Sequence, residues 1–211
     1  MFRQPMEIIL SLPAVFLALS FHEFAHAWTA DRLGDDTPRK HGRLTLAPLV
    51  HIDWMGLVLF ALFGFGWAKP VQVNPSKFRK KRLGDILVAL SGPAANLLTA
   101  VIAVFLYVAL SAFAPNYPAV DTILAITDYI IYLNIVFCLL NLLPIPPLDG
   151  YRIIKNLFFR SNIRLFLLYE RYGTYILIAF LLLGLFDTAV SIPAYAVYRF
   201  LVSNGMKLLG L

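Results

Sequence analysis

Long runs of apolar residues, separated by short polar segments, dominate the chain. Each run is at least as long as the roughly 20 residues that an α-helix needs to cross the hydrocarbon core of a membrane. The pattern therefore predicts four long transmembrane helices, at Pro5 to Ala30, Leu83 to Ala114, Ile123 to Leu148 and Leu165 to Phe186.

Three further segments carry weaker patterns. Trp54 to Ala68 is apolar but short for a crossing and contains three glycines, so we expect a re-entrant hairpin. Val71-Gln72-Val73 alternates apolar and polar residues, and Pro70 and Pro75 bracket it, which indicates the edge of a β-sheet. Such an edge could bind an unwound substrate through main-chain hydrogen bonds. The alternative is a surface connection. Ala189 to Leu211 predicts a weaker C-terminal helix.

Composition agrees with a membrane protein. The 211 residues are 60% hydrophobic and 14% charged, whereas about a quarter of a soluble domain is charged. We expect an all-α polytopic membrane protein with residues 1–211 forming one membrane-embedded domain. A cleaved signal peptide is the alternative for the first helix, although cleavage would remove its most unusual residues. The single cysteine, Cys138, lies in an apolar run and is expected to pack there.

The basic residues predict an orientation. Nine Lys and Arg lie between Leu33 and Arg82, five lie between Gly150 and Arg171, and none lies between Pro115 and Thr122. Loops rich in Lys and Arg stay in the cytoplasm, so both basic regions should be cytoplasmic and the Pro115–Thr122 link should lie on the outer side of the membrane. The membrane is expected to be the cell membrane. This bias explains the net charge of +6 without a nucleic-acid partner.

The first long helix carries His22, Glu23 and His26. Residues four apart share a helix face, so both imidazoles can bind one metal ion with Glu23 beside them. This is the HExxH pattern of zinc proteases, in which zinc activates water and the carboxylate is the general base. Ionisable groups inside a membrane helix cost roughly 2.5 kcal/mol or more each and usually mark a functional site.

A catalytic zinc needs a third protein ligand. His41 and His51 lie in the basic loop, where His51-Ile52-Asp53 could be a second polar site or a hydrogen-bonded turn. Asp149 follows Pro144, Pro146 and Pro147, which end a helix at the cytoplasmic face. His26 lies seven residues before Leu33, roughly 10 Å along a helix, so His26 and Asp149 are expected at one depth.

Several strings together resemble the site-2 protease family of intramembrane zinc metallopeptidases, in a short form without PDZ or CBS domains. The resemblance covers roughly Phe21 to Arg152. Its anchors are His22-Glu23-x-x-His26, Gly42-Arg43-Leu44-Thr45-Leu46, His51-Ile52-Asp53, Lys69-Pro70-Val71, Ser91-Gly92-Pro93-x-x-Asn96 and Asn141-x-x-Pro144-x-x-Pro147-Leu148-Asp149-Gly150. Two positions depart from it, Ala47 where many short members have Asn and Trp54 where Pro is usual, and both bear on substrate selection rather than on zinc chemistry.

The resemblance implies one Zn²⁺ per chain, held by His22, His26 and Asp149, with Glu23 as the base. It also implies that Asn141 holds the substrate or its oxyanion, for which the alternative is a helix-to-helix hydrogen bond. Asn96 is expected near the active site. The small residues that precede it are typical of close helix packing.

The sequence predicts an intramembrane zinc endopeptidase that cleaves transmembrane segments of membrane proteins near the cytoplasmic face. Two other classes stay open, a metal transporter or sensor that uses the same three ligands and an inactive membrane scaffold. The transporter leaves Glu23 without a role, and the intact ligands and base argue against the scaffold. Substrate identity and oligomeric state cannot be read from the sequence.

Overall fold

The structure is a computed structural model that describes residues 5–113, 118–158 and 163–208. Its long helices are α1 (Pro5–Arg32), α5 (Lys81–Phe113), α6 (Pro118–Leu142) and α8 (Ile163–Leu182). All four are long and apolar enough to cross a membrane. The described residues contain no named strand, so the predicted all-α polytopic class is confirmed.

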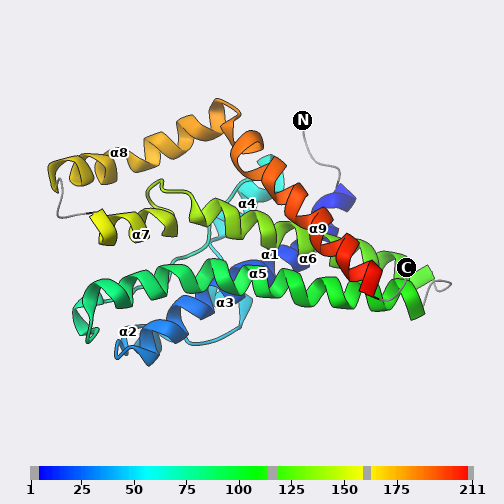
Figure 1. Ribbon diagram of the computed structural model, residues 1–211, viewed down its shortest axis with the longest axis horizontal. Helices are drawn as coiled ribbons and strands as arrows, with labels where there is room; N and C mark the ends of the chain where they lie inside the picture. The colour runs from blue at the N-terminus through cyan, green and yellow to red at the C-terminus, as the bar shows by residue number, and fades with distance from the viewer. Residues whose placement is uncertain (1–4, 114–117, 159–162, 209–211) are drawn as a thin grey trace.

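Helices α1, α5 and α6 run along the long axis of the molecule and pack against one another (Figure 1). Small side chains allow this close approach, because fully buried alanines line both α1 and α5. They are Ala14, Ala18, Ala27, Ala30, Ala89 and Ala100. Many large apolar side chains of the long helices remain exposed, as expected for surfaces that face lipid.

The expected hairpin at Trp54 to Ala68 is present. Helix α4 (Trp54–Phe63) ends at Gly64, whose φ of 75° is left-handed, and the chain then folds back over the helix. A Cβ at Gly66 would come within 2.0 Å of the carbonyl oxygen of Gly56, so only glycine permits this approach. Ala68 returns to form an isolated antiparallel bridge with Ile52.

The predicted edge at Val71 to Val73 is not a β-strand in this structure. The three residues pair with no other strand, and hydrogen bonds anchor the chain just before and just after them. The N–H of Lys69 donates to the carbonyl of His51, and the N–H of Asn74 donates to the carboxylate of Asp35. Two short elements flank this part of the chain before α5, the helix α3 (Pro48–His51) and the 3₁₀ turn η1 (Pro75–Lys77).

The sequence pattern predicts a polar link from Asp149 to Arg164, between the third and fourth long helices, and this prediction was wrong. Asp149–Phe158 forms a helix, α7, and the third long helix ends at Leu142 rather than Leu148. It also begins earlier than expected, at Pro118, while residues 115–117 of the expected link and residue 114 of the expected second helix lie outside the described part. The prolines from Pro144 onward break the helix, and the polar residues of α7 serve the site described below.

The C-terminal region comprises a π-helical turn (Asp187–Ser191) and α9 (Ile192–Leu208). Helix α9 packs on α5 and α6, with Ala194 buried in a cluster that includes Val104, Val108 and Ile131. The short helix α2 (Thr37–Lys40), the start of α5, α7 and the start of α8 gather at the left end of Figure 1. The basic segments in these elements therefore lie at one end of the molecule, opposite the last residues of α5 and the first residues of α6.

Candidate metal centre

Helix α1 places His22, Glu23 and His26 in the interior. These three residues are 6 to 7% exposed, and the Nε2 atoms of the two histidines lie 2.9 Å apart. Four residues separate the histidines, so an unbroken helix puts both rings on one face. The helical spacing read from the sequence is therefore realised.

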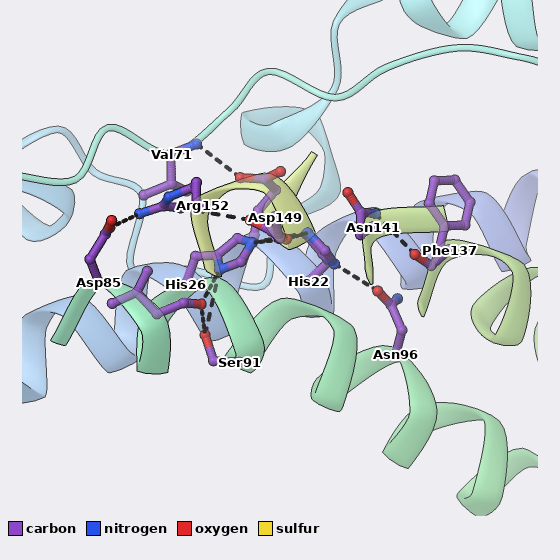
Figure 2. Close-up of polar contacts among 12 residues, drawn as sticks. His22, His26, Val71, Asp85, Ser91, Asn96, Phe137, Asn141, Asp149 and Arg152 are labelled. Atoms are coloured by element: carbon purple, nitrogen blue, oxygen red, sulfur yellow. Dashed lines mark hydrogen bonds and ion pairs between the residues drawn. The ribbon is translucent and has the colours of Figure 1, made fainter. Parts of the chain in front are cut away.

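Asp149 reaches this face from the first turn of α7. Its Oδ2 lies 3.2 Å from Nε2 of His22 and 3.1 Å from Nε2 of His26, and the three side chains point toward one another (Figure 2). Gly150 makes the approach possible, because a Cβ there would come within 2.2 Å of the carbonyl oxygen of Leu142. The break after α6 thus returns the chain tightly enough to bring Asp149 to α1.

The outer nitrogen of each histidine faces an acceptor. Nδ1 of His26 lies 2.7 Å from the carbonyl oxygen of Val88, and Nδ1 of His22 lies 2.7 Å from Oδ1 of Asn96. A carbonyl can only accept, so Nδ1 of His26 carries a proton, and in the neutral ring, the form that binds a metal, Nε2 offers a lone pair.

A chain of amides fixes the same state for His22. The side-chain nitrogen of Asn134 donates to the carbonyl of Ile130, which leaves its oxygen facing Asn96. Asn96 therefore turns its nitrogen toward Asn134 and the carbonyl of Ala18, and its oxygen toward His22. Nδ1 of His22 must donate to that oxygen, so its Nε2 also offers a lone pair to the centre.

Three acceptor atoms converge on one point. Oδ2 of Asp149 and both Nε2 atoms lie within 4.8 Å of one another. Tetrahedral zinc with bonds of 2.0 to 2.2 Å requires ligand atoms roughly 3.3 Å apart, close to the separations here. The donor set fits zinc.

Gly92 of α5 lies directly against this centre. A Cβ at that position would come within 2.5 Å of Nε2 of His26 and 2.6 Å of Cε1 of His22. The absent side chain therefore provides the room in which the two rings meet.

Glu23 is held beside the centre by the chain rather than by another side chain. Its Oε2 accepts a hydrogen bond of 2.8 Å from the backbone N–H of Val71. The segment that the sequence assigned to substrate therefore also orients the carboxylate that the sequence assigned as base.

A cavity of about 730 Å³ opens onto the centre. Val71 and Val73 line it, as does Asn141, whereas Gln72 is exposed outside it. The side chain of Asn141 donates to the carbonyl of Phe137 in its own helix at 3.0 Å, so the helix-to-helix bond considered from the sequence is not what forms. The remaining polar atoms of this amide are left for the cavity.

An ion-pair network on α7 supports Asp149 from behind. Arg152 contacts Oδ1 of Asp149 at 3.7 Å and Asp85 of α5 at 2.5 Å (Figure 2). Asn156 donates to the other oxygen of Asp85 at 2.6 Å. Asp149, Arg152 and Asn156 share one face of α7. Sequence analysis missed Arg152 and Asp85, although the spacing of apolar residues from Tyr151 to Phe158 indicates an amphipathic helix.

The other polar candidates have structural roles. His51 is fully buried, with Nε2 2.8 Å from the carbonyl oxygen of Thr45, and Asp53 caps α4 by accepting the N–H of Gly56. The hydrogen-bonded turn, rather than a second site, is the correct reading of this string. Burial, then the charge of Glu170, raises the pKa of Tyr151 to about 12, so this cavity-lining phenol stays protonated at neutral pH.

Comparisons with known proteins agree with this geometry. The model of Peptidase family M50 matches residues 116–184. The chain is 45% identical over 148 residues, 68% of its length, to "Putative zinc metalloprotease YwhC" of Bacillus subtilis, of which it covers 66%. It is 38% identical over 151 residues to "Putative zinc metalloprotease Rip2" of Mycolicibacterium smegmatis, over 68% of this chain and 55% of that protein.

The chain thus spans about two thirds of the Bacillus relative and about half of the mycobacterial one. No solved structure matches it.

Proposed function

Because the chain belongs to peptidase family M50, the site-2 protease family, we propose that it is an intramembrane zinc endopeptidase that cleaves transmembrane segments of membrane proteins. Residues 1–211 act as one membrane-embedded domain. The observation that carries the proposal is the convergence of His22, His26 and Asp149, with Glu23 beside them, on a cavity within the helices.

His22, His26 and Asp149 hold one Zn²⁺ per chain. When bound, zinc supplies Lewis acidity toward a water molecule and toward the scissile carbonyl. Glu23, oriented by the N–H of Val71, takes a proton from that water and delivers it to the leaving nitrogen. Asn141 faces the same cavity and donates to the substrate or to its developing oxyanion.

The substrate is a membrane-spanning helix that unwinds locally, since its own hydrogen bonds otherwise shield the scissile carbonyl. Val71-Gln72-Val73 lies at the cavity and offers main-chain groups to such an extended segment. This role is supported by the two valines that line the cavity and by the anchored ends of the segment at Lys69 and Asn74.

Cleavage takes place near the cytoplasmic face of the cell membrane. The basic segments that surround α2, the start of α5 and α7 lie at one end of the molecule, and the positive-inside rule assigns that end to the cytoplasm. The metal ligands lie toward this end, six residues before the end of α1 and at the first residue of α7.

Two variants test the proposal, with purified protein and a panel of single-span substrates. Glu23→Gln should retain zinc but lose nearly all cleavage, because the amide keeps the shape of the side chain and cannot take up a proton. Asp149→Ala should lose zinc and cleavage together. Unchanged zinc content and activity in Asp149→Ala would remove this residue from the site.

A metal transporter gives a different result. Flux of zinc in reconstituted vesicles would survive Glu23→Gln, and the wild-type chain would cleave none of the substrates. An inactive scaffold would bind the substrates without either cleavage or flux.

A further inference from the structure

A second pocket lies apart from the metal centre, between the end of α1 and the start of α5. It has a volume of about 430 Å³, and we call it the basic pocket. The residues that line it are Arg32, Leu33, Gly34, Phe78, Arg79, Lys80, Leu83, Gly84 and Leu87. None of them lines the cavity at the metal centre.

The basic pocket has three cations and no acidic residue in its lining. Within the described residues, Arg32, Arg79 and Lys80 form no ion pair with a carboxylate, although Arg32 lies next to Asp31 in the sequence. Three other cations of this part of the chain are paired: Arg39 with Asp31, and Lys40 and Lys77 with Asp36. The three cations that line the basic pocket therefore keep positive charge that no carboxylate of the described residues compensates.

The turn that carries Arg79 and Lys80 is anchored by a buried aromatic residue. Phe78 is only 4% exposed and lies against Gly84, where a Cβ would come within 2.6 Å of its ring. This contact fixes the turn from which Arg79 and Lys80 project. On the opposite side, the guanidinium of Arg32 lies 5.2 Å from the centre of the Trp28 ring, an aromatic residue of the kind found at membrane interfaces.

An apolar track leads away from the cations. Leu83, Leu87 and Leu90 are 40 to 49% exposed and follow one face of α5 at the i, i+4 and i+7 positions. This face continues into the part of α5 that is apolar enough to cross a membrane. Positive charge at the end of the spanning helices, joined to an exposed leucine face within the span, matches a molecule with an anionic head and an acyl tail.

We propose that the basic pocket binds an anionic phospholipid. The phosphate group contacts Arg32, Arg79 and Lys80, and an acyl chain lies along Leu83 and Leu87. Basic pockets between transmembrane helices on the cytoplasmic side suit anionic head groups, and each cation near such a surface strengthens the attraction. The lipid bridges the end of α1, which carries the metal-binding histidines, and the start of α5.

The test counts lipids bound to the full chain in detergent by native mass spectrometry during titration with dioleoyl phosphatidylglycerol. Arg79→Gln combined with Lys80→Gln should weaken binding on the order of tenfold. The matched control is Arg39→Gln combined with Lys40→Gln, which removes the same charge from paired cations and should leave binding unchanged. Equal zinc content in both variants verifies that they fold alike.

Three results would overturn the proposal. The control could weaken binding as much as the pocket variant, which would indicate attraction to overall charge. Dioleoyl phosphatidylcholine, which has the same chains and no net charge, could bind equally well. Inorganic phosphate at equal concentration could displace the lipid fully, which would make the pocket a site for free anions.

Discussion

His22 depends on a residue 74 positions away for its chemical state. The carbonyl of Ile130 sets the orientation of Asn134, Asn134 sets that of Asn96, and Asn96 requires a proton on Nδ1 of His22. Partners of this kind orient metal-binding imidazoles and raise their basicity. The amides buried between α1, α5 and α6 therefore belong to the metal centre rather than to packing alone.

Asn96→Ala should weaken zinc binding roughly ten- to hundred-fold, because the imidazole of His22 loses the acceptor that holds its ring and tautomer. A chelator competition titration measures this. The control is Thr99→Val, on the same helix, since the Thr99 hydroxyl bonds, among the residues that the structure describes, only to the carbonyl of Ala95 in α5. Equal zinc affinity in Asn96→Ala and the wild type would show that helix packing alone positions His22.

At the scale of elements, the segment from Lys69 to Asn74 has two separable roles. The N–H of Val71 holds Glu23, whereas the structure gives the N–H of Val73 no hydrogen-bond acceptor among the described residues. Proline removes an N–H, so substitution at each position isolates one role.

Val71→Pro should lower kcat at least tenfold, because Glu23 loses the group that orients it. Val73→Pro should instead raise KM several-fold, because only pairing with the substrate is lost, and Gln72→Ala should change neither value. Steady-state kinetics with a single-span substrate, at equal zinc content, distinguish these effects. Wild-type kinetics in Val73→Pro would leave the segment as a surface connection.

Helix α7 is attached to α5 by the Arg152–Asp85 pair, which also contacts the outer oxygen of Asp149. A double-mutant cycle with Arg152→Gln and Asp85→Asn, measured on the zinc dissociation constant, should give a coupling energy of about 1 kcal/mol. The same cycle on the exposed Arg39–Asp31 pair should give none. Additive effects at Arg152 and Asp85 would mean that the pair does not act on Asp149.

Local patterns predicted the long helices, the hairpin and the HExxH face, because each depends on residues close in sequence. Helix α7 was missed because its polar residues were taken for a loop. Their role depends on the ion pair of Arg152 with Asp85 of α5, which is distant in sequence. The bond from Val71 to Glu23 joins positions 48 apart and leaves no periodic signal. The ligand roles of His22, His26 and Asp149 stay predictions that the geometry supports.

For the whole molecule, the basic segments gather at one end, and the positive-inside rule predicts that this end faces the cytoplasm. In a Cys138→Ser background, Arg79→Cys should be protected from a membrane-impermeant thiol reagent applied to intact cells, whereas Ala119→Cys should be labelled. The reverse pattern would invert the orientation and place the metal ligands near the outer face.

Gly92 sets how closely α5 approaches the histidine rings of α1. The room for the rings of His22 and His26 is the volume of one missing methyl group. Position 92 therefore affects the site although glycine has no side chain that could bind or donate. No replacement there is conservative, because even the smallest, alanine, enters the space of Nε2 of His26. A substitution table based on residue similarity would rank glycine to alanine among the mildest changes. At position 92 such a table would greatly underestimate the damage to the site.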